Sequence, residues 1–357
     1  MNKKLRIAIV SKLWEETSPH SRGGTGSSIG FLVDGLVDRG HQVTLFASGN
    51  SKTKAQKLIS VKSEHYQGDY SEIHEYNNIA QAFKRSDDFD IIHCAVEHKS
   101  LIFADLVKTP SLHSVRYGEF FQQERDLFRE YRHLNYVGIS KSLKKVLPFI
   151  NWQDFIYNGI DYQDFKQSKE KGDYLLFLAR VSPQKGIDIA IKVAKKLNMK
   201  LIIAGKISST DENFLQKNFY PFIDGKQIIY LGEVLGEKKK KLLSQAYCLI
   251  QPNRVVEAFG NSVLEAMASA IPVVVYDQGA FKELIINGKT GYVVDNFKDL
   301  IKAVKNVQNI NKQDCLQRVK DFFSLEKMVF SYENLYSKII KESKNKKLRP
   351  KNLTNLK

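Results

Sequence analysis

Cysteine is scarce in this chain, and no two cysteines are spaced to share a metal ion. Only Cys94, Cys248 and Cys315 occur among the 357 residues, and they stand far apart in the sequence. A zinc ribbon or a redox-active pair needs cysteines two residues apart, and no such pair exists. An odd number of isolated cysteines is typical of a reducing compartment. The cysteines therefore predict no metal site and an intracellular protein.

Long apolar runs are also missing. The first apolar run, Leu5–Val10, is shorter than the core of a signal peptide, and no small-residue cleavage site follows it. No stretch approaches the roughly 18–20 apolar residues that span a bilayer. We therefore expect a cytoplasmic protein without a membrane-spanning segment, with peripheral binding to the cytoplasmic membrane face left open.

Acidic residues are the scarcer charges. The chain has 39 Asp and Glu against 55 Lys and Arg, which gives a net charge of +16. Such an excess predicts an anionic partner, which is a nucleic acid, a membrane surface or a phosphate-bearing substrate. An ordinary lysine-rich surface explains the excess equally well. Part of the excess lies in the basic tail Lys341–Lys357, so the charge of the folded body is smaller.

Apolar strands alternate with amphipathic helices along the chain. Leu5–Ser11 is continuously apolar, as in a buried parallel strand, and Ser27–Arg39 has apolar residues at helical spacing. The polar stretch Gln163–Gly172 interrupts this alternation, and the apolar run Tyr174–Ala179 restarts it. The pattern predicts an α/β protein of two doubly wound domains that face a central cleft. We place the domains at residues 1–162 and 163–323, a packed helix at 324–343 and a frayed basic tail at 344–357.

Three segments partly match nucleotide or metal loops but fail in detail. Asn287–Thr290 ends like a P-loop, but Glu283 stands where that loop needs its first glycine. Gly23–Gly26 lies too far after its strand for a dinucleotide loop, and no acidic residue ends the next strand. Asp88–Asp90 precedes its strand, which is the wrong end for a ligand. The sequence therefore predicts neither a P-loop enzyme nor a dinucleotide-dependent one.

Two loops of the second domain carry residues suited to a diphosphate. Arg180 and Lys185 follow a strand, and two cations on one short loop can hold a diphosphate without a metal ion. Glu257 and Glu265 flank a helix start at which Gly260 permits close approach and the N–H groups favour anionic oxygens. Both carboxylates can accept hydrogen bonds from sugar hydroxyls. A solvated turn and two ordinary helix-flanking acids remain the alternative interpretation.

The E-x-F-G-x-x-x-x-E pattern from Glu257 to Glu265 resembles the signature of the family-4 retaining glycosyltransferases, which have the GT-B fold. Further segments resemble this family in the same order along nearly the whole chain. They are Gly23-Gly24, His113, Ser140, Asn158-Gly159-Ile160-Asp161, the R-x-S-P-x-K-G loop from Arg180 to Gly186, and Gly279, Glu283, Gly288 and Gly291. Two positions depart from the family, because Gly26 replaces an acidic residue and Ala270 replaces a glycine. The resemblance implies two Rossmann-like domains and a final helix that crosses back onto the first domain.

The resemblance implies a donor site in the second domain. Arg180 and Lys185 would bind the diphosphate of a nucleoside-diphosphate sugar and stabilise it as the leaving group, with no metal ion and no other cofactor. Glu265 would hydrogen-bond the ribose, and Glu257 would hold the donor sugar. Donor binding would also involve the backbone of Phe259, Gly260 and Asn261.

The first domain would complete the site. Gly23 and Gly24 would approach the diphosphate, and His113 would contact the donor sugar. All eight histidines lie at or before His133, so an imidazole at the site has to come from this domain. A histidine of the core is the alternative interpretation of His113. The predicted catalytic residues are His113, Glu257, Arg180 and Lys185.

The implied function is retaining, metal-independent transfer of a sugar from a nucleoside-diphosphate sugar to an acceptor hydroxyl, in cell-envelope glycan or glycolipid synthesis. The acceptor would be a glycan or a lipid-linked molecule. A weak contact with anionic membrane stays open, and no nucleic acid partner is expected. Two alternatives remain, which are a non-enzymatic basic binder of membrane or nucleic acid and a hydrolysing sugar-nucleotide epimerase of the same fold.

Overall fold

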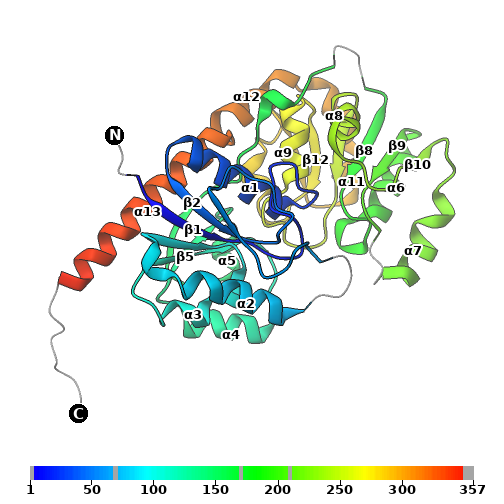
Figure 1. Ribbon diagram of the computed structural model, residues 1–357. Helices are drawn as coiled ribbons and strands as arrows, with labels where there is room; N and C mark the ends of the chain where they lie inside the picture. Colours follow the sequence, from blue (N-terminus) through cyan, green and yellow to red (C-terminus); the bar gives the residue numbers. More distant parts are fainter. Residues whose placement is uncertain (1–3, 67–70, 169–171, 208–210, 349–357) are drawn as a thin grey trace.

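A sheet of parallel strands forms the centre of the first domain (Figure 1). The computed structural model describes residues 4–66, 71–168, 172–207 and 211–348. The strand order is β3-β2-β1-β4-β5-β6-β7. The strands are β1 (Arg6–Val10), β2 (Gln42–Phe46), β3 (Lys57–Ile59), β4 (Ile91–Cys94), β5 (Ser111–Val115), β6 (Asn135–Gly138) and β7 (Trp152–Phe155). Strands β4 and β5 are buried at every residue, so their sequences show no alternation between polar and apolar residues.

Helices cover both faces of this sheet. Helix α1 (Gly24–Asp38) packs on one face, and α2 (Glu72–Phe83) and α3 (Leu101–Ala104) pack on the other. Helices α4 (Gln122–Glu130) and α5 (Leu143–Val146) follow β5 and β6. The strand order reverses between β1 and β4. The loops after these two strands therefore diverge and open a crevice at the carboxyl edge of the sheet.

The second domain repeats this plan with the strand order β10-β9-β8-β11-β12-β13. Its strands are β8 (Tyr174–Leu178), β9 (Lys200–Ala204), β10 (Ile228–Tyr230), β11 (Cys248–Gln251), β12 (Val273–Tyr276) and β13 (Gly291–Val294). Its helices are α6 (Ile187–Leu197), α7 (Glu212–Asn218), α8 (Gly236–Ser244), α9 (Asn261–Ala268), α10 (Phe281–Leu284), α11 (Phe297–Asn306) and α12 (Lys312–Phe322). The order reverses between β8 and β11, so the loops after these strands form the second crevice. These are the two loops in which the sequence predicts the donor site.

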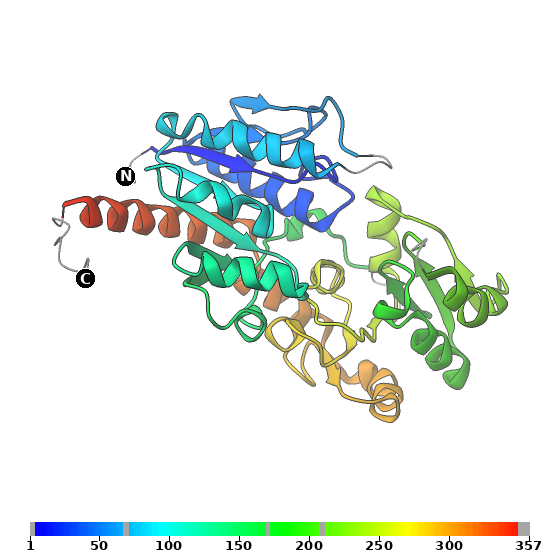
Figure 2. The same ribbon diagram turned by 90° about the horizontal axis from the view of Figure 1, so that it is seen from below.

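The last helix, α13 (Leu325–Leu348), crosses back onto the first domain, as the sequence predicts (Figures 1 and 2). Its apolar side packs with α1 and the sheet, and Tyr332 and Tyr336 are fully buried there. Glu333 lies at the same interface, where its carboxylate accepts a hydrogen bond from Arg39 at 2.8 Å and contacts His41 at 3.1 Å. The chain therefore begins and ends its folded part in the same domain.

Several local predictions differ from the structure. Helix α1 spans Gly24–Asp38 and so begins earlier than the predicted Ser27. Strand β3 was not expected, because its three residues carry no pattern. Helix α13 continues beyond the predicted end at Ser343 to Leu348, and the rest of the predicted tail lies outside the described residues.

All strands of the first sheet lie within residues 1–162 and all strands of the second within 163–323. The domain limits at these positions stay a prediction. In the part of the chain that the structure describes, no helix combines the length and the apolar character that crossing a membrane requires.

Enlarging Gly35 tests the contact between α1 and α13. A Cβ atom at Gly35 would lie 2.4 Å from Cγ2 of Val329, a side chain that cannot swing away easily because it is β-branched. We expect Gly35→Leu to destabilise the protein by about 2 kcal/mol through overpacking. The double variant Gly35→Leu/Val329→Ala should recover most of this loss, as measured by chemical denaturation. An equal loss of unfolding free energy in the single and the double variant would contradict the contact between Gly35 and Val329.

Candidate functional site

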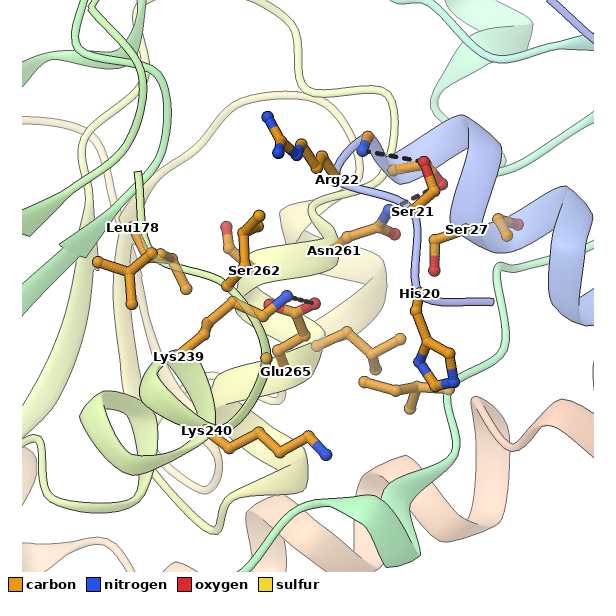
Figure 3. A pocket seen from close by; sticks show the side chains of 18 of the residues that line it. His20, Ser21, Arg22, Ser27, Leu178, Lys239, Lys240, Asn261, Ser262 and Glu265 are labelled. Carbon is orange, nitrogen blue, oxygen red and sulfur yellow. Dashed lines mark hydrogen bonds and ion pairs between the residues drawn. The ribbon is translucent and has the colours of Figure 1, made fainter. Parts of the chain in front are cut away.

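Two helix N-termini meet between the domains. Helix α1 begins at Gly24 and helix α9 begins at Asn261. The Asn261 amide donates to the Gly24 carbonyl at 3.4 Å and accepts from Nδ2 of Asn158 at 3.0 Å. Figure 3 shows Asn261 beside the loop that carries Ser21. Because the free N–H groups and the positive dipole end of both helices face the same space, this position favours an anion.

Two adjoining cavities, of about 420 and 620 Å³, open at this position. Arg180 lines both of them. The smaller cavity is bordered by the glycine loop before α1 and by α8, and the larger one by the loops after β5 and β11. The residues common to both cavities are Gly24, Asn158, Leu178, Ala179, Arg180, Asn261 and Ser262.

Lys185 and Glu257 form an ion pair beside the larger cavity. Nζ of Lys185 lies 2.6 Å from Oε2 of Glu257, which also accepts a hydrogen bond from Asn253 at 2.7 Å. The loops that carry them approach closely because of Gly186, where φ is +72° and a Cβ would lie 2.1 Å from the Pro252 carbonyl. The predicted cation and carboxylate are thus brought together, and each holds the other in place.

A second ion pair borders the smaller cavity. Nζ of Lys239, on α8, lies 2.7 Å from Oε1 of Glu265, on α9 (Figure 3). Lys239 was missed by the sequence analysis, because it stands in a run of four lysines that resembles an ordinary solvated helix face. Its contact with Glu265 makes it a candidate for the same ligand.

The predicted backbone site lies at the start of α9. Gly260 adopts a left-handed conformation with φ of +104°, and a Cβ there would lie 2.8 Å from the Phe281 ring. Phe259 is buried in the core below, which anchors the turn. Gly260 and Asn261 therefore present their backbone to the larger cavity.

The structure does not bring His113 to the cleft. Its imidazole is only 1% exposed within β5, where the two ring nitrogens lie 2.8 Å from the hydroxyls of Ser100 and Ser111. Burial lowers the pKa of His113 to about 3, so the ring is neutral. It lines neither cavity, and the residue that reaches the cleft from this strand is Arg116, in the following loop. This is the core placement that the sequence left as the alternative.

Glu15 is a cleft residue that the sequence analysis missed. Oε1 of Glu15 accepts the N–H of Gly26 at 2.8 Å, in the first turn of α1. A side chain at Gly23 would collide with this carboxylate, since its Cβ would lie 1.3 Å from Oε2. Burial raises the pKa of Glu15. The carboxylate of Glu15 thus lies against the start of α1, from the loop that leads into this helix.

Arg116 connects the cleft to the interior of the first domain. Its side chain is nearly buried, and Nη2 donates to Oδ1 of Asn158 at 2.9 Å. The same oxygen accepts from the Ser28 hydroxyl at 2.8 Å. Asn158, from the N-G-I-D turn, therefore links α1, the loop after β5 and, through Asn261, the second domain. Within the described ranges, no three His, Cys, Asp or Glu side chains are grouped closely enough to hold a metal ion.

The second domain also matches a family of known proteins. Residues 160–319 match the family described as glycosyl transferases group 1. The second domain is thus similar in sequence to the glycosyl transferases of group 1. An uncharacterised glycosyltransferase of Methanocaldococcus jannaschii is 28% identical to the chain over 334 residues, which cover 80% of this chain and 84% of the relative. The O-antigen chain mannosyltransferase RfbU of Salmonella typhimurium is 32% identical over 185 residues, 49% of this chain and 50% of the relative.

Solved structures of glycosyltransferases share the GT-B fold of this enzyme. AviGT4, a glycosyltransferase involved in avilamycin A biosynthesis, superposes with a TM-score of 0.69 at 19% identity, over 94% of this chain and 98% of that one. Anabaena HepE, in complex with UDP and glucose, superposes with a TM-score of 0.73 at 16% identity, over 93% and 99%. The predicted GT-B architecture is thereby confirmed.

The contact between Glu15 and the glycine loop can be tested by a double-mutant cycle. Glu15→Ala should destabilise the glycosyltransferase by about 1 kcal/mol, because the Gly26 N–H loses its acceptor at a helix start. Gly23→Ala should cost a similar amount, since it displaces the same carboxylate. The double variant should be no less stable than Glu15→Ala alone. If the stability losses of the two single variants add up in the double variant, as measured by thermal unfolding, positions 15 and 23 are independent and the contact is contradicted.

Proposed function

We propose that this glycosyltransferase is a family-4 retaining enzyme that moves a sugar from a nucleoside-diphosphate sugar to an acceptor hydroxyl without a metal ion. The observation that carries the proposal is the convergence of Arg180, Lys185 and the N-termini of α1 and α9 on one space. A diphosphate gains negative charge as it leaves the sugar. Fixed cations and N–H groups at that position stabilise the charge when it develops in the transition state.

The carboxylates provide partners for the neutral parts of the donor. Glu257 lines the larger cavity and is placed to accept hydrogen bonds from sugar hydroxyls. Glu265 lines the smaller cavity and is placed to accept them from a ribose. Lys185 pairs with Glu257, and Lys239 pairs with Glu265. Both lysines can turn to phosphate oxygens when the donor binds, and the donor hydroxyls can then donate hydrogen bonds to the two carboxylates.

We infer that the new bond forms on the same face of the sugar as the bond that breaks. The acceptor oxygen attacks the anomeric carbon as the bond from that carbon to the phosphate oxygen breaks, and the acceptor proton passes to the leaving diphosphate. Glu257 is held by Lys185 and Asn253, an environment suited to hydrogen bonding and not to nucleophilic attack. A trapped covalent sugar–enzyme adduct would overturn this mechanism.

The names of the relatives point to the class of substrate. HepE is described in complex with UDP and glucose, and RfbU and Staphylococcus aureus CapM are described as enzymes of O-antigen and capsular polysaccharide synthesis. We propose a nucleotide-sugar donor and a glycan or lipid-linked acceptor of the cell envelope. We also propose that the enzyme works in the cytoplasm, with peripheral contact at the membrane face where such an acceptor would lie.

Nucleotide binding provides the test. In a thermal-shift screen of UDP, GDP and ADP and their sugars in the presence of EDTA, we expect one nucleoside diphosphate to raise the melting temperature. Arg180→Ala and Lys185→Ala should each remove that shift, because each removes a phosphate contact. Lys192→Ala, on the outer side of α6, serves as the control and should keep it. If both cleft variants bind the nucleotide like the wild type, the site is assigned wrongly. Release of free sugar without transfer would instead indicate the hydrolysing epimerase.

A further inference from the structure

Glu283 reaches from the second domain into the first. Its carboxylate, on α10, accepts the backbone N–H groups of Lys141 and Ser142 at 2.7 Å each. It also accepts the hydroxyl of Tyr157 at 3.0 Å. These are charge-assisted hydrogen bonds, which are about twice as strong as neutral ones. Lys141 and Ser142 follow Ser140, so two family-like segments for which the sequence offered no role meet each other here.

The same short segment supports the donor loop from below. Gly279 has φ of +60°, and a Cβ there would lie 2.1 Å from the carbonyl oxygen of Glu257. The next residue, Ala280, donates its N–H to that carbonyl at 2.9 Å. The Phe281 ring is fully buried and packs under Gly260. A rigid stretch of a few residues therefore connects the Glu257–Gly260 loop to the carboxylate of Glu283.

Glu283 is also held firmly within its own domain. Arg318, on α12, donates from Nη2 to the Glu283 carbonyl at 2.8 Å and from Nε to the Leu284 carbonyl at 3.3 Å. These contacts fix the end of α10. A movement of Lys141 and Ser142 relative to Glu283 is therefore a movement of one domain relative to the other.

The contact lies where the chain passes between the domains. The Tyr157 ring packs on Phe323 with a centroid distance of 5.3 Å and on Phe259 at 6.1 Å. The following residue, Asn158, bonds to Asn261 in the cleft. Tyr157, which bonds to Glu283, is therefore followed directly by Asn158, which bonds to Asn261. These two residues connect the Glu283 contact to the start of α9, where Asn261 meets Gly24.

We propose that Glu283 is a positioning residue that acts as the pivot between the domains and keeps the Glu257–Gly260 loop aligned with Gly23 and Gly24. Productive geometry needs donor contacts from both domains at once, and small misplacements of reacting groups lower the rate strongly. The pivot lies outside both cavities, so its loss leaves Arg180 and Lys185 in place to bind nucleotide. Its effect should therefore fall on turnover and not on nucleotide affinity.

Kinetics of three variants test this role, which rests on the proposed donor. Glu283→Ala should lower kcat at least 10-fold while the Kd of the nucleoside diphosphate changes less than threefold. Glu283→Gln should have an intermediate kcat, because its single amide oxygen cannot accept all three hydrogen bonds that the carboxylate accepts. Tyr157→Phe, which removes one of them, should have the smallest loss. The control is Lys282→Ala, an exposed neighbour paired with Asp277 in its own domain, which should match the wild type.

Hydrogen exchange tests the pivot without any substrate. The amides of Lys141 and Ser142 should be protected in the wild type and exchange at least 10-fold faster in Glu283→Gln, while amides of β5 keep their protection. Unchanged exchange together with unchanged kcat would overturn the pivot, and so would a kcat loss matched by an equal loss of nucleotide affinity. If Glu283→Ala does not fold, the kcat values of Tyr157→Phe and Glu283→Gln provide the test. The proposal expects a larger kcat loss in Glu283→Gln than in Tyr157→Phe, and wild-type kcat in both variants would overturn it. Failure of every nucleotide to bind the wild type would instead refute the proposed donor and leave the exchange result standing.

Discussion

The convergence of two helix N-termini on one space is the constraint on which the rest of this structure depends. Each terminus carries a positive partial charge of about half a unit, and Arg180 and Lys185 add full charges nearby. Positive charges gathered so closely repel one another unless negative groups lie beside them. Three carboxylates do so, because Glu15 accepts a helix N–H, Glu257 pairs with Lys185, and Glu265 pairs with Lys239. An incoming diphosphate therefore exchanges partners within a network that already exists.

The fold serves this constraint by joining the two domains tightly near the chain crossover. Helix α13 returns to the first domain and is fixed there by buried polar contacts. One of them is His93, whose ring nitrogens lie 2.6 Å from the hydroxyls of Tyr336 and Ser114. Burial lowers the pKa of His93 to about 3, so it stays neutral. The two histidines inside the first sheet, His93 and His113, thus have structural partners in the core and line neither cavity.

The sequence was informative where a function lies within one short segment. Arg180 and Lys185 share a loop, and Glu257 and Glu265 flank the start of one helix, so their spacing alone placed each pair beside the same cleft. The contacts of Lys239 with Glu265 and of Glu283 with Lys141 join distant segments, and no local pattern marks them. The resemblance to the glycosyltransferases placed His113 at the cleft. Strand β5 is buried at every residue, and the sequence of such a strand does not reveal which way a side chain points. Glu15 was missed because the loop that carries it has no periodicity.

The stereochemistry of transfer tests the central claim most directly. The nucleotide sugar identified by binding should be incubated with an acceptor in the presence of EDTA, and the anomeric configuration of the new bond determined by NMR. Attack on the same face as the leaving diphosphate should retain the configuration of the donor. Stabilisation of that diphosphate by cations and helix N–H groups should keep the rate in EDTA within about twofold of the rate without it. An inverted product, or activity lost in EDTA and restored by a divalent cation, would contradict this account.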